Sequence, residues 1–171
     1  RLELGSENVW LLSLSPAHVG GLALLTRALL LGSTLVAYGT FRAEIVSQLI
    51  DGKILPGGIS PVTHMSLVPT QLVRLLEFRD GRRVPASFKC GLIGGAYAPR
   101  DLIRQGLAAG WPLALTYGMT EMTSQVATAR PSEVNHKPGS VGRALTGTII
   151  KVDNAGQILT QGRTLAQGYV G

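Results

Sequence analysis

The sequence predicts an α/β protein: a mostly parallel sheet flanked by helices, followed by the start of a small β-rich subdomain. Three observations support this fold class. The 171 residues are 45% apolar and 15% charged, which is typical of a folded globular chain. Strand-like apolar runs alternate four times with helix-like segments, and short β-rich pieces separated by turns follow. We assign residues 1–137 to the α/β part and residues 138–171 to the β-rich subdomain.

The first part of the chain predicts two strands, each followed by a helix. Residues 9–15 are a short apolar run that ends at a proline, and residues 20–31 form a long apolar segment of helical length. Residues 34–38 have the composition of a second strand. A weaker helix is expected at residues 43–50, and the proline and glycines that follow it form a loop.

The next part repeats this pattern with clearer boundaries. The β-branched run 62–68 predicts a strand, and the helix 69–78 starts at a proline, which costs no hydrogen bond at the first helical position. Residues 88–93 form the next strand. The helix 98–109 ends at a glycine, and the strand 113–117 follows. Because parallel neighbours require crossover connections, this alternation favours a parallel sheet, which binds ligands at the carboxyl ends of its strands.

Charge and cysteine usage narrow the class of protein. The net charge of +6 suggests an anionic ligand, but the densest basic stretch, residues 74–83, also contains acidic residues and is expected to be a solvated helix end. The single cysteine, Cys90, excludes a disulfide framework and favours a reducing compartment, so we expect a cytoplasmic protein. The apolar segment 19–32 has about 14 residues against the roughly 20 that a membrane span needs, and no targeting signal is visible.

Several common catalytic motifs are absent from the sequence. It has no phosphate-binding P-loop, no dinucleotide-binding glycine motif, no zinc-hydrolase motif and no serine-hydrolase elbow. The three histidines are too scattered to suggest a metal cluster. Cys90 lies in an apolar strand, where a buried core thiol is expected instead of a nucleophile.

Two loops remain as candidate ligand sites because each follows a predicted strand. Gly94, Gly95 and Ala96 form a small-residue loop that would let a flat group such as a purine approach the backbone. The same glycines could instead allow close helix packing. The segment 116–121 combines an aromatic ring, a hydroxyl and a carboxylate, which would suit a base, a phosphate and Mg²⁺. Its residues could equally be a core tyrosine, a helix start and a solvated glutamate.

These motifs resemble the adenylate-forming superfamily of acyl-CoA synthetases, adenylation domains and luciferases. The resemblance rests on YGMTE at 117–121 with GGA upstream, on LSLSPAHVGG at 12–21, and on KPGSVGRAL and GQILTQGRTLAQGY near the end. It covers essentially the whole chain. Within the superfamily, THMSLVPTQLVRLL and YGMTEMTSQVAT are most similar to the o-succinylbenzoate–CoA ligases of menaquinone biosynthesis.

The resemblance implies roles for particular residues. Gly94, Gly95 and Ala96 would form the adenine side of the site, with Tyr117 stacking on the base. Gly118, Met119 and Thr120 would contact ATP, Thr120 and Glu121 would act in catalysis, and Glu121 would bind Mg²⁺. His18 would lie beside the reacting carboxylate.

The implied reaction has two steps: an acid attacks ATP to give an acyl-adenylate, and coenzyme A then takes the acyl group. The implied ligands are therefore ATP, Mg²⁺, coenzyme A and a small carboxylic acid. For the second carboxylate of o-succinylbenzoate we name Arg74 and Ser124 as candidate contacts. We expect no nucleic acid partner, and a homo-oligomer is compatible with the sequence.

The chain also departs from the family pattern. Tyr97 follows the GGA loop where the family often has proline, and Ala17 replaces an aromatic residue before His18, which would widen the acid pocket. The family's phosphate-binding loop should precede Arg1, and its ribose-binding aspartate and catalytic lysine should follow Gly171. We therefore expect an internal fragment of a large N-terminal domain, inactive by itself. The alternatives are a ligase for another acid and, from a different class, a basic nucleic-acid-binding domain, against which the 5% aromatic content argues.

Overall fold

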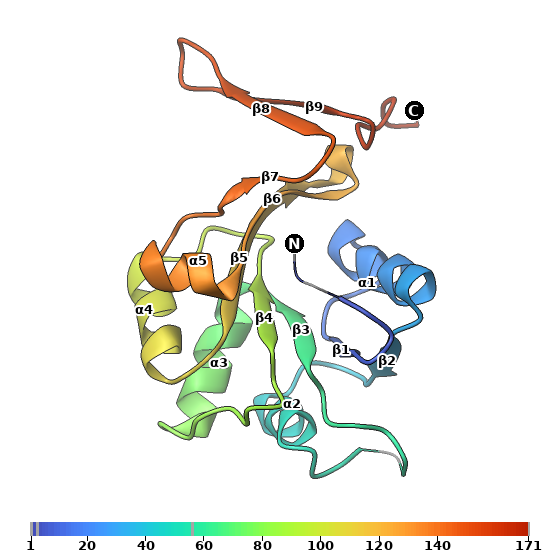
Figure 1. Ribbon diagram of the computed structural model, residues 1–171, viewed down its shortest axis with the longest axis vertical. Coiled ribbons are helices and arrows are strands. Elements are labelled where there is room, and N and C mark those ends of the chain that lie inside the picture. The colour runs from blue at the N-terminus through green and yellow to red at the C-terminus, as the bar shows by residue number, and fades with distance from the viewer. Residues whose placement is uncertain (1, 3, 56, 171) are drawn as a thin grey trace.

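The computed structural model describes residues 2, 4–55 and 57–170, and its centre is a seven-stranded sheet (Figure 1). The strands of this sheet are β1 Val9–Leu12, β2 Thr34–Ala37, β3 His64–Leu67, β4 Cys90–Ile93, β5 Leu113–Met119, β6 Ser124–Ala129 and β7 Arg143–Ala144. The helices are α1 Val19–Leu31, α2 Ala43–Ile50, α3 Pro69–Arg79, α4 Arg100–Ala108 and α5 Pro131–His136, with a short 3₁₀ turn, η1, at Thr120–Met122. The predicted α/β class, mostly parallel with flanking helices, is confirmed.

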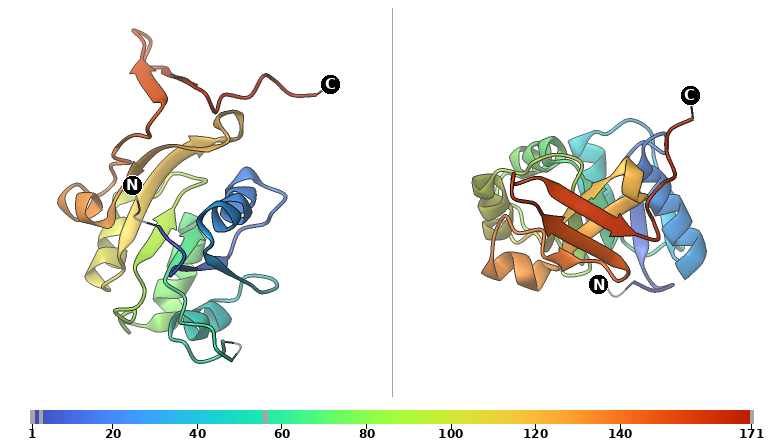
Figure 2. Two further views of the ribbon diagram at one scale, coloured as in Figure 1. Left: turned by 45° about the vertical axis from the view of Figure 1, so that its right-hand side comes forward. Right: turned by 90° about the horizontal axis from the view of Figure 1, so that it is seen from above.

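The strand order is β2-β1-β3-β4-β5-β6-β7, and the first five of these strands are parallel. From β1 the chain moves one way along the sheet to β2 and then crosses back to β3 on the other side of β1. Right-handed crossovers then place α1 on one face and α2, α3 and α4 on the other, as Figures 1 and 2 show. Sheets of this order bind ligands where the direction reverses, between the carboxyl ends of β1 and β3.

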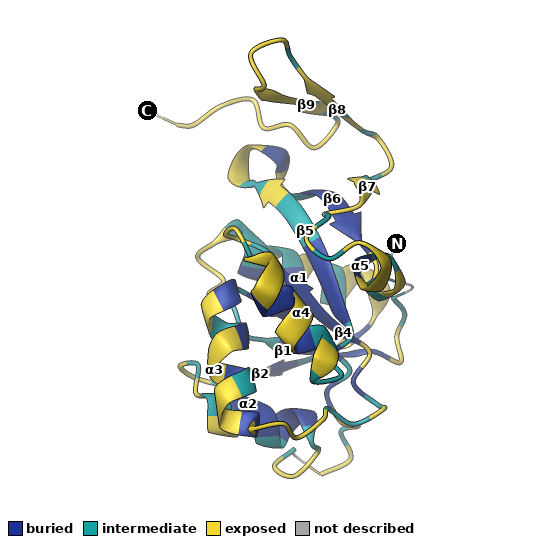
Figure 3. Ribbon diagram, turned by 90° about the vertical axis from the view of Figure 1, so that its left-hand side faces the viewer, coloured by how far each residue is buried: buried dark blue, intermediate teal, exposed yellow. Residues whose placement is uncertain are grey.

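Each face of the sheet has its own apolar core. Alternate residues of β1 point to opposite faces: Val9 and Leu11 join the larger core under α2, α3 and α4, whereas Trp10 joins a smaller core with Leu24 of α1. The central strands are buried (Figure 3), as expected for a parallel sheet covered on both faces. Burial on both faces explains why these strands read as continuous apolar runs.

Local signals set the boundaries of α3. Pro69 occupies its first turn, and the side-chain oxygen of Gln71 accepts a hydrogen bond of 3.0 Å from the backbone N–H of Val68. The helix ends at Asp80, which adopts a left-handed conformation. The solvated helix end predicted for residues 74–83 is wrong for Arg79, which is 2% exposed. Its guanidinium donates to Ser47 and Asp51 at 2.7 and 3.0 Å and so ties α3 to α2.

The sequence reading did not include β6 or α5. β6 returns antiparallel to β5, and β7 extends the same edge of the sheet. A separate antiparallel hairpin follows, formed by β8 Thr148–Val152 and β9 Ile158–Gly162 (Figure 2, right). The β-rich region therefore contains one strand of the large sheet and one independent hairpin, and the domain division at 137/138 stays a prediction. Among the described residues, no helix has the length and apolar character needed to cross a membrane.

Candidate active site

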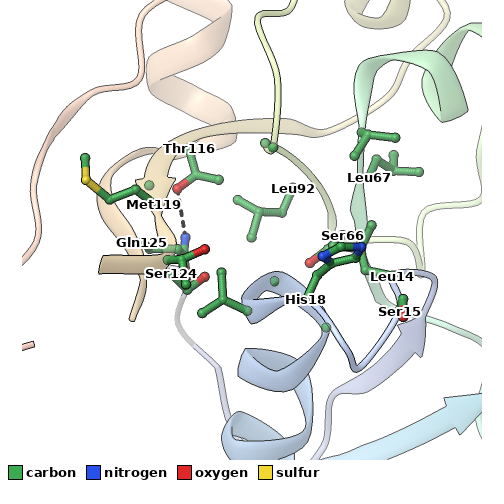
Figure 4. Close-up of a pocket in the computed structure, with 18 of the residues that line it drawn as sticks. Leu14, Ser15, His18, Ser66, Leu67, Leu92, Thr116, Met119, Ser124 and Gln125 are labelled. Carbon is green, nitrogen blue, oxygen red and sulfur yellow. Dashed lines mark hydrogen bonds between the residues drawn. The ribbon is translucent and has the colours of Figure 1, made fainter. Parts of the chain in front are cut away.

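A cavity of about 430 Å³ lies at the carboxyl ends of the parallel strands, beside α1. Its walls come from the loop after β1, the first turns of α1, the ends of β3, β4 and β5, and the start of β6. Figure 4 shows Leu14 and His18 on one side and Ser124 and Gln125 on the other, with Leu92 between them. The cavity thus occupies the place where the strand order reverses, and it extends along the sheet to β5 and β6.

The turn between β5 and β6 depends on a glycine. A Cβ atom at Gly118 would overlap the backbone carbonyl of Ser124, and the strand register shifts between Tyr117 and Gly118. Thr123 and Ser124 have positive φ values of 55° and 99°, which non-glycine residues rarely adopt. This compact turn places Gly118, Met119, Thr120 and Ser124 in the cavity wall.

The double-glycine loop after β4 packs against the neighbouring strand. A Cβ atom at Gly94 would lie 2.6 Å from the Thr116 side chain, and Gly95 has a φ of +78°. The glycines therefore allow a close approach to β5 and not only to a helix. Gly94 and Gly95 line the cavity, whereas Ala96 is exposed and lies outside its lining.

His18 lies at the opposite wall, where α1 begins. It occupies the N-cap position with extended backbone angles, but its side chain makes no capping hydrogen bond. The His18 side chain therefore does not cap α1, and it lines the cavity. A Cβ atom at Gly21 would overlap the Ser15 carbonyl, so this glycine lets the first turn of α1 pack onto the loop after β1.

Arg27 is a cavity residue to which the sequence analysis assigned no role. Its Nη2 atom donates to Gln125 Oε1 at 2.8 Å, and its guanidinium lies 5.1 Å from the centre of the Trp10 ring. The buried Nη1 atom has no hydrogen-bond partner, and no salt bridge to Arg27 is formed within residues 2, 4–55 and 57–170. Burial lowers the pKa of Arg27, but a guanidinium stays protonated in proteins.

Gln125, which accepts the hydrogen bond from Arg27, is itself held by two threonines. Its Nε2 atom donates to the hydroxyls of Thr116 and Thr128 at 3.1 and 2.9 Å. These bonds orient the amide so that its oxygen faces Arg27. Both groups that hold the guanidinium, an amide and an indole ring, are neutral, so its positive charge stays available to an anion in the cavity.

Glu121 lies just outside the cavity, next to Thr120. Hydrogen bonds from its own backbone N–H and from the Tyr169 hydroxyl hold the pKa of this exposed carboxyl below its usual value. The described residues contain no group of three His, Cys, Asp or Glu side chains able to hold a metal by themselves. One ionised carboxylate nevertheless fits Mg²⁺ that arrives with ATP, because this ion is usually held by one or two carboxylates plus substrate phosphates.

The structure brings together only part of the predicted site. The predicted residues that line the cavity are His18, Gly94, Gly95, Gly118, Met119, Thr120 and Ser124. Tyr117 is half-buried and Glu121 exposed, both adjacent to lining residues. Arg74 is exposed and is not brought to the cavity, because the buried face of α3 is formed by Leu72 and Leu75 and Arg74 lies outside that face. The roles of these residues stay predictions.

The AMP-binding enzyme family matches residues 1–170 of this sequence. The chain belongs to the AMP-binding enzyme family. It is 32% identical over 178 residues to the 2-succinylbenzoate–CoA ligase of Geobacillus sp., covering 99% of the chain and 35% of that protein. It is 34% identical over 157 residues to the Bacillus subtilis ligase of the same name, covering 92% of the chain and 30% of that protein.

Solved structures agree with this assignment. The chain superposes with a TM-score of 0.84 and 32% identity on the B. subtilis O-succinylbenzoate coenzyme A synthetase in complex with ATP and magnesium ion, over 98% of the chain and 35% of that protein. The E. coli enzyme with a bound analogue of OSB-AMS superposes with a TM-score of 0.75 and 31% identity, over 98% of the chain and 33% of that protein. The predicted resemblance is confirmed, and the chain spans about a third of the length of these relatives.

Proposed function

We propose that this AMP-binding chain is part of an ATP-dependent acid–CoA ligase whose acid is o-succinylbenzoate. One observation carries the proposal: the lining of a single cavity includes the glycine loop, Thr120 and the Arg27 guanidinium, which has no acidic partner among the described residues. The glycine loop and Thr120 suit a nucleotide, and the guanidinium suits the carboxylate of a dicarboxylic acid that does not react. The relatives' names and their bound ATP and magnesium support the same ligands.

The chemistry requires that two anions meet. The acid's reacting carboxylate attacks the α-phosphorus of ATP, and pyrophosphate leaves. The thiol of coenzyme A then attacks the acyl carbon of the adenylate, which forms the thioester and releases AMP and the thiol proton. His18, at the cavity wall, would donate a hydrogen bond to the reacting carboxylate, and the Thr120 hydroxyl would donate to a phosphate oxygen. Glu121 would hold Mg²⁺, which neutralises negative charge on the phosphates.

Arg27 would select the acid. A charged hydrogen bond to a buried group contributes about 1.5–3 kcal/mol, and an aromatic acid that has only the reacting carboxylate would gain none of it. The guanidinium therefore replaces Arg74 as the expected contact of that carboxylate, and Ser124, in the same wall as Gln125, stays a candidate contact.

The test uses Arg27→Gln and Arg74→Ala in the full-length ligase. We expect Arg27→Gln to raise the KM for o-succinylbenzoate about 10- to 100-fold while changing the KM for its monocarboxylate analogue less than about threefold. Arg74→Ala should change neither value. Equal effects of Arg27→Gln on the KM values of both acids would contradict the assignment of o-succinylbenzoate as the substrate. If the full-length ligase turns over another acid faster, that acid becomes the assigned substrate.

The same proposal extends to partners and location. We infer a cytoplasmic enzyme because the single cysteine is buried and unpaired. We also infer that nucleic acid is not a partner, which a salt titration with single-stranded RNA tests. A steep loss of RNA affinity with salt, together with ATP binding unaffected by Glu121→Gln, would favour a nucleic-acid-binding module instead. A homo-oligomer stays a prediction.

A further inference from the structure

The segment after β9 is tied to the turn that carries Glu121. The Tyr169 hydroxyl donates to Glu121 Oε1 at 2.8 Å, although the two residues are 48 positions apart. The backbone N–H of Ala166 donates to the Glu121 carbonyl at 2.7 Å, and the Thr123 hydroxyl donates to the Thr164 carbonyl at 2.8 Å. Figures 1 and 2 show this C-terminal segment passing beside the tip of the β5–β6 hairpin.

Apolar packing does not explain the position of Tyr169. Its side chain is 77% exposed, and its neighbour Val170 is fully exposed. The hydrogen bond to Glu121 is therefore the contact that orients the ring. Conversely, no salt bridge to Glu121 is formed in the part of the chain that the structure describes, so a neutral phenol is what holds its carboxylate.

This arrangement has the properties required of a metal-binding carboxylate. The phenol donates to Oε1, and no side chain among the described residues donates to Oε2, so one oxygen can bind a cation while the other is held. Because the phenol is neutral, the carboxylate keeps its full negative charge. Hydrogen-bonded partners of metal ligands commonly have this orienting role.

We propose that Tyr169 is a positioning residue that holds the Glu121 carboxylate in the orientation in which it binds the Mg²⁺ of MgATP. This inference rests on the proposed function, because it requires that Glu121 binds the ion. It makes the segment 164–169, whose residues contact the Glu121 turn, part of the nucleotide site, although no residue of this segment lines the cavity.

The experiment measures ATP binding against Mg²⁺ concentration in the full-length ligase, using calorimetry. Tyr169→Phe removes the hydroxyl and keeps the ring, and Val170→Ala is the matched control in the same exposed segment. We expect Tyr169→Phe to raise the Mg²⁺ concentration needed for half-maximal ATP binding about tenfold. AMP binding without Mg²⁺ should be unchanged, and Val170→Ala should behave as the wild type in both assays.

A double mutant makes the test specific. In a Glu121→Gln background the ion ligand is already lost, so adding Tyr169→Phe should produce no further change in Mg²⁺ dependence. An unchanged Mg²⁺ dependence for Tyr169→Phe in the wild-type background would overturn the inference. So would an equal loss of AMP binding, since that indicates a merely structural role. If the wild type binds no ATP at any Mg²⁺ concentration, the proposed function fails as well.

Discussion

The guanidinium of Arg27 lies over the indole ring of Trp10, 5.1 Å from the ring centre, and the ring of His64 stacks on the same indole with the ring centres 4.9 Å apart. Trp10 comes from β1 and Arg27 from α1, so the contact joins the sheet to the helix that covers it. A cation on an aromatic face forms a pair with a net positive charge, whereas a cation beside a carboxylate forms a pair with no net charge. Trp10 therefore supports the group that we propose as the acid-selecting residue.

Trp10→Leu should weaken selection for a dicarboxylic acid. The cation–π contact stabilises the guanidinium in its position by about 1 kcal/mol. Without it, the KM for o-succinylbenzoate should rise roughly fivefold relative to the KM for its monocarboxylate analogue. Steady-state kinetics with both acids measures this ratio. Trp111→Leu is the control, because Trp111 is equally buried but packs edge-on against Phe88, in the core on the other face of the sheet. If both variants shift the ratio alike, the effect is general destabilisation.

Gly118→Ala should disrupt the turn that carries the ATP contacts. The added methyl would overlap the Ser124 carbonyl, and backbone atoms cannot move aside cheaply, so we expect the free energy of unfolding to fall by about 2 kcal/mol or more. Gly39→Ala should change it by less than about 0.5 kcal/mol, because nothing lies within 4 Å of its Cβ position and its φ is not positive. Urea denaturation measures both, and similar values for the two variants would show that the turn can adjust.

Stability should fall in mild acid because of His64. Burial lowers the pKa of this histidine from 6.5 to about 4, so between these pH values the unfolded chain binds more protons than the folded one. The stabilisation is complete above pH 6.5 and is lost as the pH falls towards 4, by at most about 1.4 kcal/mol per pH unit. Denaturation curves at several pH values measure this slope. His64→Gln should flatten it, and an unchanged slope would assign the pH dependence to other groups.

The order and type of most elements could be predicted from the sequence because their signals are local. Pro69 and Gln71 mark the start of α3 within four residues, and the run Cys90–Ile93 is apolar enough to be a buried strand. β6 was missed because Ser124–Ala129 mixes polar and small residues, and its burial comes from pairing with β5 and β7. Pairing partners of this kind carry no local signature.

The candidate site divides in the same way. Gly118, Thr120 and Glu121 are neighbours in sequence, so the nucleotide turn could be named as a unit, and the glycine loop precedes it by one helix and one strand. Arg27 could not be assigned, because its contact with Gln125 spans 98 positions and exists only once α1 covers the sheet. The exposed position of Arg74 depends likewise on how α3 packs.

The amino-acid sequence alone determined the α/β class, the family, and the two loops at the strand ends, since each of these follows from residue types within short windows of chain. Only the tertiary structure decided which cation reaches the cavity and which hydroxyl holds Glu121. The physical reason is that charge selection and ligand orientation depend on distances between groups from separate elements, and the strand order and helix packing set those distances.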